Sequence, residues 1–222
     1  MGGLKAVVLG ATGMIGELLV QQLSTDDRFE SVQLLVRRSI PAIHPKITVT
    51  VVNFDDPKEP GKSLGHGDVI FCALGTTKAK VKGDKAAYRK VDFEIPLEVG
   101  KQGLLNGFTQ YVLVSAVGAD PKAGNFYTKL KGEIEEALKT LGYPALHIFR
   151  PSLLMGKRKE HRTGEKMAQL IMPIFSVILI GKLKRFHPIK GETVARAMIE
   201  AASANRKGHH VYHYPDIQRL TS

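Results

Sequence analysis

Tyr127 and Lys131 stand four residues apart in a stretch with the pattern of a helix, and Ser115 precedes them at the end of an apolar run. Residues with this spacing share one face of a helix, so the phenol and the ammonium can meet. The three groups suit the reduction of a carbonyl or its reverse. The phenol donates a proton to the forming alkoxide, the ammonium favours the phenolate, and the serine holds the carbonyl oxygen. A fortuitous exposed pair is the alternative.

Residues 4–16 carry a second motif, in which the apolar run Leu4–Leu9 stops at Gly10 and Gly13 and Gly16 follow. In a strand–turn–helix, the first glycine lets the backbone turn, the second lets it approach a pyrophosphate, and the third lets the helix pack on the strand. The helix N-terminus then offers free N–H groups to phosphates. A purely structural glycine turn is the alternative. The cofactor-binding residues predicted here are Gly10, Thr12, Gly13, Met14, Ile15 and Gly16.

Elements that can position these motifs alternate along the chain. The predicted strands are Leu4–Leu9, Ser31–Val36, Ile47–Val52, Asp68–Ala73, Tyr111–Ser115, Ala145–Phe149 and His209–Tyr214. After the helix that begins at Met14, the predicted helices are about Asp84–Asn106 with a kink at Pro96, Phe126–Leu141, about Gly164–Ile180 and Glu192–Ala204. Apolar strands that alternate with helices favour an α/β fold: a doubly wound, mostly parallel sheet with helices on both faces. We expect one nucleotide-binding domain over residues 1–222, in which about 155–222 form a small C-terminal extension on the substrate side.

Arg37 and Arg38 follow the second predicted strand, about twenty residues after Gly16, where an NAD site places an Asp or Glu for the ribose. A guanidinium suits a 2′-phosphate instead, because it can form paired hydrogen bonds with its oxygens. This pair therefore predicts NADP(H) in preference to NAD(H). The alternative is that both arginines are ordinary loop charges.

The ends of the next two strands complete the predicted cofactor site. Asp55 follows the third strand, where its side chain can reach the adenine amino group, although an aspartate is also a common turn residue there. Leu74, Gly75 and Thr76 follow the fourth strand and are expected to line the middle of the cofactor. The small glycine permits close approach.

Composition limits the remaining function classes. The chain has 222 residues, a formal net charge of +11 and a single cysteine, Cys72, so an intrachain disulfide is excluded. With no secretory signal recognised, a cytoplasmic location is expected. Three basic clusters, Lys78–Lys90, Lys157–Arg162 and Lys182–Lys190, carry much of the charge. The first contains a single aromatic residue, Tyr88, which argues against specific nucleic-acid binding. They are interpreted as solvated surface that attracts an anionic cofactor, and Cys72 as a packing residue.

Two further signals are interpreted structurally. The apolar stretch Met167–Ile180 is too short to span a bilayer and contains Pro173, so core or subunit-interface packing is favoured over docking on a membrane surface. His209, His210 and His213 crowd the last predicted strand, but only the first and third share a face. No metal site is therefore predicted.

Several segments together resemble the atypical short-chain dehydrogenase/reductases, most closely the Tat-interacting oxidoreductase-like branch, over essentially the whole chain. They are Gly-Ala-Thr-Gly-Met-Ile-Gly, Leu-Gly-Thr-Thr, Val-Leu-Val-Ser-Ala-Val-Gly-Ala, Tyr-Thr-Lys-Leu-Lys and Phe-Arg-Pro-Ser-Leu-Leu. The resemblance implies a Rossmann fold, NADP(H) binding and a catalytic centre of Ser115, Tyr127 and Lys131. It also implies that Pro151 and Leu153 lie near the nicotinamide.

The chain departs from the wider family at two points. Cys72-Ala73-Leu74-Gly75 replaces the Asn-Asn-Ala-Gly segment of other members, and Asn106 is a poor match for their catalytic asparagine. The water-linked proton relay of those members is therefore left without a matching asparagine in this sequence.

Two hypotheses follow. The first is an NADP(H)-dependent oxidoreductase acting on an unidentified small carbonyl or alcohol, with Tyr127 as general acid and base. The second is an NADP(H)-sensing regulatory protein that binds the cofactor and a protein partner with little catalysis. The intact Ser115, Tyr127 and Lys131 favour the first, and the sequence leaves a homo-oligomer open.

Overall fold

The computed structural model describes residues 2–77, 79–156 and 181–222. Seven strands in these residues form one parallel sheet with the order β3-β2-β1-β4-β5-β6-β9. The strands are β1 (Leu4–Leu9), β2 (Phe29–Val36), β3 (Ile47–Val51), β4 (Val69–Cys72), β5 (Gln110–Val114), β6 (Ala145–Phe149) and β9 (Gly208–Tyr212). The predicted α/β fold is confirmed, and all seven predicted strands are present with ends that differ by at most two residues.

The chain order reverses at the centre of this sheet. β1 pairs with β2 on one side and β4 on the other, so that Leu9 lies opposite Leu35 and Cys72. All strands are parallel, and their carboxyl ends therefore meet at one edge. Ligands of such sheets bind at this edge, where the strand order reverses.

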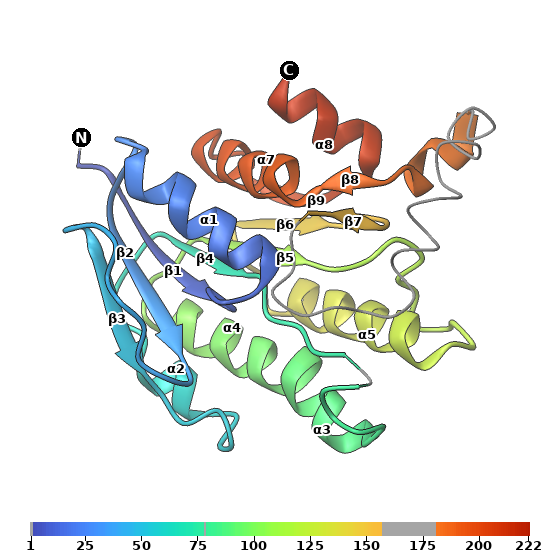
Figure 1. Ribbon diagram of the computed structural model, residues 1–222, viewed down its shortest axis with the longest axis horizontal. Helices are drawn as coiled ribbons and strands as arrows, with labels where there is room; N and C mark the ends of the chain where they lie inside the picture. Colours follow the sequence, from blue (N-terminus) through green and yellow to red (C-terminus); the bar gives the residue numbers. More distant parts are fainter. Residues whose placement is uncertain (1, 78, 157–180) are drawn as a thin grey trace.

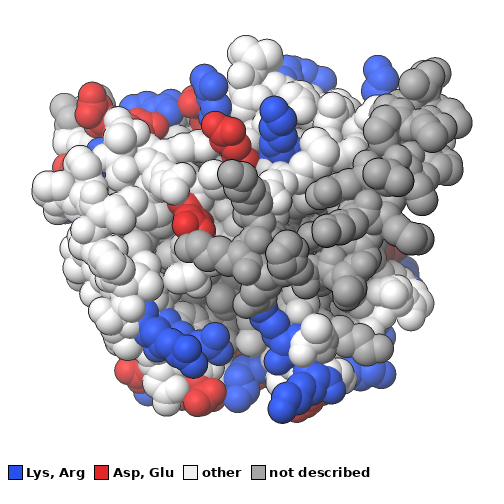
Figure 2. Space-filling view, viewed as in Figure 1, with Lys and Arg blue, Asp and Glu red and all other residues white. Residues whose placement is uncertain are grey.

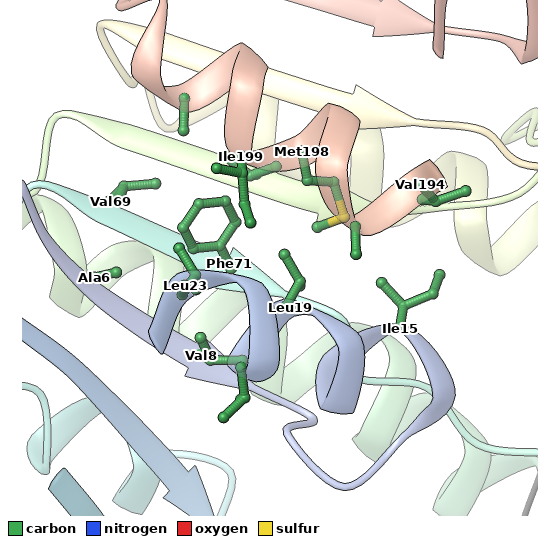
Figure 3. Packing of buried hydrophobic residues seen from close by; sticks show 14 of the residues in the cluster. Ala6, Val8, Ile15, Leu19, Leu23, Val69, Phe71, Val194, Met198 and Ile199 are labelled. Atoms are coloured by element: carbon green, nitrogen blue, oxygen red, sulfur yellow. The ribbon is translucent and has the colours of Figure 1, made fainter. Parts of the chain in front are cut away.

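Helices cover both faces of the sheet (Figure 1). One face carries α1 (Met14–Thr25), α7 (Gly191–Ser203) and α8 (Tyr214–Thr221), and the other carries α4 (Ile95–Leu105) and α5 (Phe126–Thr140). The apolar side chains between α1 and α7 include Ile15, Leu19, Leu23, Val194, Met198 and Ile199 (Figure 3). The opposite core contains Ile95, Val99, Ile134 and Leu138. Burial of both cores fixes the sheet, and with it the edge where the strands end.

The long helix predicted over Asp84–Asn106 is interrupted by a π-helical turn. It consists of α3 (Lys85–Arg89), a π turn at Lys90–Glu94 and α4, with the N–H of Ile95 donating to the carbonyl of Lys90. Proline donates no hydrogen bond, and its ring clashes with the carbonyl four residues earlier. The wider turn just before Pro96 accommodates this ring, so the predicted irregularity is present one turn ahead of the proline.

The C-terminal part differs most from the prediction. The last strand ends at Tyr212 instead of Tyr214, and the unpredicted helix α8 follows at once, with Pro215 in its first turn. A two-stranded sheet of β7 (Leu154–Met155) and β8 (Ile189–Lys190) and the short α2 (Glu59–Lys62) were also not predicted. The predicted helix 164–180, the apolar stretch 167–180 and the basic cluster 157–162 lie outside the described residues.

Two surface properties bear on ligand binding. In the residues that the structure describes, no helix has both the length and the apolar character needed to cross a bilayer. Figure 2 shows Lys and Arg side chains gathered on the lower part of the viewed face, where Figure 1 places α3. Lys82 and Lys85, on and next to this helix, are exposed.

Candidate active site

The glycine turn lies between β1 and α1, at the edge where the strands end. Gly10 has a φ of +80°, and a Cβ at Gly16 would lie 2.0 Å from the carbonyl oxygen of Gly10, so both positions require glycine. Gly13 differs, because the nearest atom to a Cβ there is 3.3 Å away and the next 4.0 Å away. Gly13 also begins α1 without any side-chain cap. The turn therefore leaves room in front of the helix N-terminus, and a side chain at Gly13 would fill it.

The other residues of the turn divide between surface and core. Thr12 is exposed, whereas Ile15 is buried in the core beneath α7. A Cβ added at Gly156 or Gly191 would lie 3.4 or 3.2 Å from the sulfur of Met14, so this side chain fills the space next to both glycines. The Ile15 side chain thus packs in the core, and the N–H groups of Met14 and Ile15 belong to the first turn of α1, where N–H groups have no intrahelical partner.

The ends of β2 and β3 form an open hollow of about 400 Å³. It is lined by Arg37, Val51, Val52, Asn53, Phe54 and Asp55. The structure therefore brings two predicted cofactor residues, Arg37 and Asp55, to one concave surface. Arg38 is exposed beside them but is not among the lining residues. Within the described part of the chain, neither arginine has an anionic partner.

The segment after β4 is held from the side of α3 and the π turn. The N–H of Thr76 donates to Asp92 Oδ2 at 2.8 Å, and the hydroxyl of Tyr88 donates to the carbonyl of Thr76 at 3.0 Å. Gly75 is exposed, and Leu74 packs on the core. This loop is fixed by its backbone, which leaves Gly75 uncovered toward the ligand edge.

Tyr127 and Lys131 lie in the first two turns of α5. Asn125 caps this helix by accepting hydrogen bonds from Tyr127 N at 2.9 Å and Thr128 N at 3.4 Å. Tyr127 is 38% exposed, whereas Lys131 is only 4% exposed. The phenol is therefore accessible from outside while its lysine neighbour is enclosed by protein.

Lys131 is paired with a carboxylate that the sequence analysis did not find. Its Nζ lies 2.9 Å from Oδ1 of Asp92, which belongs to the π turn and is also buried. Burial alone would lower the pKa of Lys131, but the negative charge of Asp92, and to a lesser degree the phenolate form of Tyr127, raise it above its ordinary value. The ammonium thus stays charged beside Tyr127.

Ser115, directly after β5, belongs to a second network that reaches α5 through Glu135. Its hydroxyl donates to Glu135 Oε1, and Glu135 also accepts from Arg150, whose Nε lies 3.0 Å from Oε1. In the described residues Ser115 makes no hydrogen bond to Tyr127 or Lys131. An ionised carboxylate only accepts hydrogen bonds, so the proton of Ser115 points to Glu135 and its lone pairs remain for a ligand.

Tyr127, Lys131 and Glu135 repeat every four residues and share one stripe of α5. Sequence reasoning stopped at the first two members, and extending the same spacing by one step would have found Glu135. Asp92 carried no such signal, because a regular helix does not show which residue a π turn moves inward.

Pro151 and Leu153 follow β6 and act through their backbone. The carbonyl of Pro151 accepts from Val117 N at 2.9 Å, and that of Leu153 accepts from Ile189 N at 3.0 Å. Pro151 is buried, so it ties the loops after β5 and β6 together at the ligand edge. Asn106 instead caps α4, and its side chain donates to Leu64 O at 2.9 Å, which is a structural role.

Comparisons with known proteins agree with this geometry. A family model described as NAD(P)H-binding matches residues 10–152, from the glycine turn to the loop after β6. The chain belongs to this family, as an atypical short-chain dehydrogenase/reductase with a Rossmann fold. The resemblance noted from the sequence motifs is thereby confirmed.

Two curated relatives and one solved structure illustrate the family. The chain is 32% identical to mitochondrial protein FMP52 of Eremothecium gossypii over 92% of this chain and 91% of the relative. It is 31% identical to protein HTATIP2 of Rattus norvegicus over 73% of this chain and 67% of that protein. A UDP-N-acetylglucosamine 4-epimerase from Methanobrevibacter ruminantium, in complex with UDP-N-acetylmuramic acid, superposes with a TM-score of 0.70 at 17% identity, over 99% of this chain and 80% of the epimerase. At this identity the likeness supports the fold alone.

Proposed function

We propose that the protein is an NADP(H)-dependent oxidoreductase that interconverts a small carbonyl compound and its alcohol, with Tyr127 as the general acid and base. The observation that carries the proposal is the pairing of an accessible Tyr127 with a buried, charged Lys131 at the ligand edge of the sheet. A phenol beside a held ammonium suits proton transfer to a forming alkoxide.

The ligand edge fits the proposed cofactor. The open space before Gly13 and the uncapped N-terminus of α1 suit a pyrophosphate. The hollow with Arg37 and Asp55 suits an adenosine, and the unpaired guanidinium of Arg37 suits a 2′-phosphate. Arg38 extends the same positive surface. These features are the basis for proposing NADP(H) in preference to NAD(H).

Each residue of the centre then has a distinct task. Bound NADP(H) supplies or accepts the hydride at its nicotinamide. Tyr127 gives its proton to the carbonyl oxygen during reduction and takes it back during oxidation. Lys131 stabilises the phenolate that is left behind. Ser115 can accept from an alcohol hydroxyl as it stands, whereas donation to a carbonyl requires its hydroxyl to turn away from Glu135.

Cofactor fluorescence tests the first half of the proposal. Purified protein is titrated into NADPH and, separately, NADH, and the absence of tryptophan leaves the cofactor as the source of the signal. We expect at least about tenfold tighter binding of NADPH, the contribution of one charge-assisted interaction. Equal affinities would remove the NADP(H) preference, and no binding of either would remove the cofactor.

Tyr127→Phe tests the second half. In a panel of aldehydes, ketones and alcohols, we expect turnover to fall by about 10²–10⁴-fold while the Kd for NADPH stays within about twofold. Tyr143→Phe is the control, because it removes a phenol whose hydroxyl donates to the carbonyl of Gly100 at 2.7 Å, before β6 begins and away from the ligand edge. Full turnover by Tyr127→Phe contradicts the proposal. NADPH binding without turnover of any panel member favours the sensor hypothesis.

For location we propose the cytoplasm, on the ground that the single Cys72 is buried and thus placed for packing. The name of the Eremothecium gossypii relative includes the word mitochondrial. Fractionation of cells that express the full chain distinguishes the two compartments, and recovery with mitochondria would overturn the cytoplasmic proposal.

A further inference from the structure

Asp92 joins two elements of the ligand edge through its two oxygens. Oδ1 lies 2.9 Å from the Nζ of Lys131 on α5, and Oδ2 accepts from the N–H of Thr76 in the loop after β4. The carboxylate is 2% exposed and sits in the π turn. It thus contacts both the catalytic helix and the loop that is placed to line the cofactor.

Lys131 depends on this carboxylate. The charged or titratable groups that face it are Asp92, Tyr127 and Cys72, of which the last is fully buried at the end of β4. Among the described residues, Asp92 is the one carboxylate within ion-pair distance of Lys131. A buried ammonium without a counter-charge gives up its proton readily, because burial disfavours the charged form.

We propose that Asp92 is a positioning residue for Tyr127 that acts through Lys131: it keeps the buried ammonium charged beside the phenol and fixes it relative to the Thr76 loop. The proposal rests on the proposed function of Tyr127. It has an unusual consequence. Direct repulsion between two acids predicts that removal of the Asp92 charge makes Tyr127 ionise more easily. Action through Lys131 predicts the opposite, because the ammonium beside Tyr127 is lost together with its partner.

Asp92→Asn tests the first step without any substrate. The amide keeps an acceptor for Thr76 and removes the charge. The titration of Lys131 is followed by NMR of lysine labelled at ¹³Cε, and the signal is assigned by its loss in Lys131→Met. We expect the midpoint of Lys131 to fall by two pH units or more, a hundredfold gain in neutral amine at a given pH. An unchanged midpoint would overturn the proposal.

Tyrosinate absorbance tests the second step. The difference between the parent and Tyr127→Phe isolates the ionisation of Tyr127, and the same difference is measured in the Asp92→Asn background. We expect the midpoint for Tyr127 to rise by about one pH unit, which corresponds to tenfold less phenolate at a given pH. A fall, or no change, would overturn the proposal.

Three controls keep the result specific. Glu98→Gln neutralises a partly exposed carboxylate of α4 that pairs with Lys101, and it should move neither midpoint. Asp92→Glu restores the charge and should restore both midpoints at least in part. Asp92→Ser replaces Asp92→Asn if that variant does not fold, with the same expected signs.

The outcome is separable from the proposed function. If Tyr127→Phe keeps full turnover, the proposed function fails whatever the titrations give. If Tyr127 is essential for turnover and Asp92→Asn lowers the titration midpoint of Tyr127, only the proposed role of Asp92 fails.

Discussion

The ligand edge has two ends: the one proposed for the reaction, at Tyr127 (the reaction end), and the one proposed for the adenosine, at Arg37 (the adenosine end). These ends hold their charged side chains in opposite ways. At the reaction end, Lys131 pairs with Asp92 and Arg150 with Glu135, and three of these four side chains are buried. At the adenosine end, Arg37 and its neighbour are exposed, and no described residue pairs with them. The charges of the reaction end are thus part of the folded structure, whereas those of the adenosine end are left for a ligand.

This difference predicts which property each substitution changes. Removing one member of a buried pair leaves the other charge buried without a partner, which lowers the free energy of unfolding. Removing an exposed, unpaired charge changes that free energy little. Substitutions at the reaction end should therefore mainly lower stability, whereas substitutions at the adenosine end should mainly lower cofactor affinity.

The largest expected effect is that of Glu135→Ala. It leaves Arg150 and the Ser115 hydroxyl without their partner, and we expect the free energy of unfolding to fall by about 3 kcal/mol, since Arg150 stays partly exposed to water. Denaturant unfolding measures this. Glu133→Ala, on the same helix, removes a pair whose Arg89 side chain is 41% exposed and should cost at most about 1 kcal/mol. Equal losses in the two variants would show that burial does not distinguish them.

The glycine turn contains both kinds of position. An alanine Cβ at Gly16 would overlap the carbonyl of Gly10, so Gly16→Ala should lower the free energy of unfolding by about 3 kcal/mol and abolish NADPH binding. Gly13→Ala meets no atom closer than 3.3 Å, so its stability should stay within about 1 kcal/mol of the parent. We expect its affinity for NADPH to fall by tenfold or more, as measured by cofactor fluorescence. Unchanged affinity would mean that no phosphate approaches Gly13.

His147 is a buried titratable group without a counter-charge among the described residues, and it sharpens the contrast with the reaction end. Burial, helped by His210 and Arg206, lowers the pKa of His147 to about 4. The unfolded chain then takes up a proton as the pH falls below about 6.5, and the folded chain does not. This contribution to stability is present above pH 6.5 and is lost toward pH 4, by about 2 kcal/mol at pH 5.

Denaturant unfolding at pH 7.5 and pH 5 measures this loss in the parent and in His147→Gln. We expect the variant to be less sensitive to acid by about the same 2 kcal/mol. His213, whose pKa is also lowered by burial, remains in both proteins and serves as the common background. An equal acid loss in parent and variant would assign the effect to other groups.

The smallest effect on stability is expected at the adenosine end. Arg37→Gln combined with Arg38→Gln should weaken NADPH binding by about 10–100-fold, leave NADH within about twofold, and change the free energy of unfolding by less than about 0.5 kcal/mol. Arg219→Gln, at a 78% exposed side chain of α8, controls for the loss of positive charge. Equal weakening of both cofactors would place the 2′-phosphate elsewhere.

The sequence was sufficient for features that depend on local spacing. The central strands could be predicted because they are almost unbroken apolar runs between turn signals, as in Val69–Cys72. The glycine turn, and the spacing of Tyr127 and Lys131, are likewise local. The structure brings Arg37 and Asp55 to one hollow because parallel strands end at the same edge.

Features that depend on three-dimensional packing were not predictable. Asp92 looks like any polar residue of a long helix until the π turn makes it face α5. The Ser115 hydroxyl was expected to donate its hydrogen bond to the substrate. In the structure it donates to the carboxylate of Glu135, which also accepts from Arg150, and this arrangement depends on packing between distant elements. Helix α8 was missed because its eight residues are too few for a clear period.

Because Asp92 lies in the π turn, its pairing with Lys131 depends on the number of residues in this helix. Deleting one residue from Lys90–Glu94 would convert the turn to ordinary α-helix. The flanking helices would stay nearly in phase, because the π turn absorbs the extra residue, but the side chains within the turn, including Asp92, would be redirected. The chain would still be helical, yet the carboxylate and the lysine would fall out of phase. We therefore expect the number of residues between the N-cap Asp84 and Pro96 to show whether a relative keeps the Asp92–Lys131 pair. This number is a better guide than the identity of any single residue in the segment. A homologue one residue shorter needs a different counter-ion for its lysine.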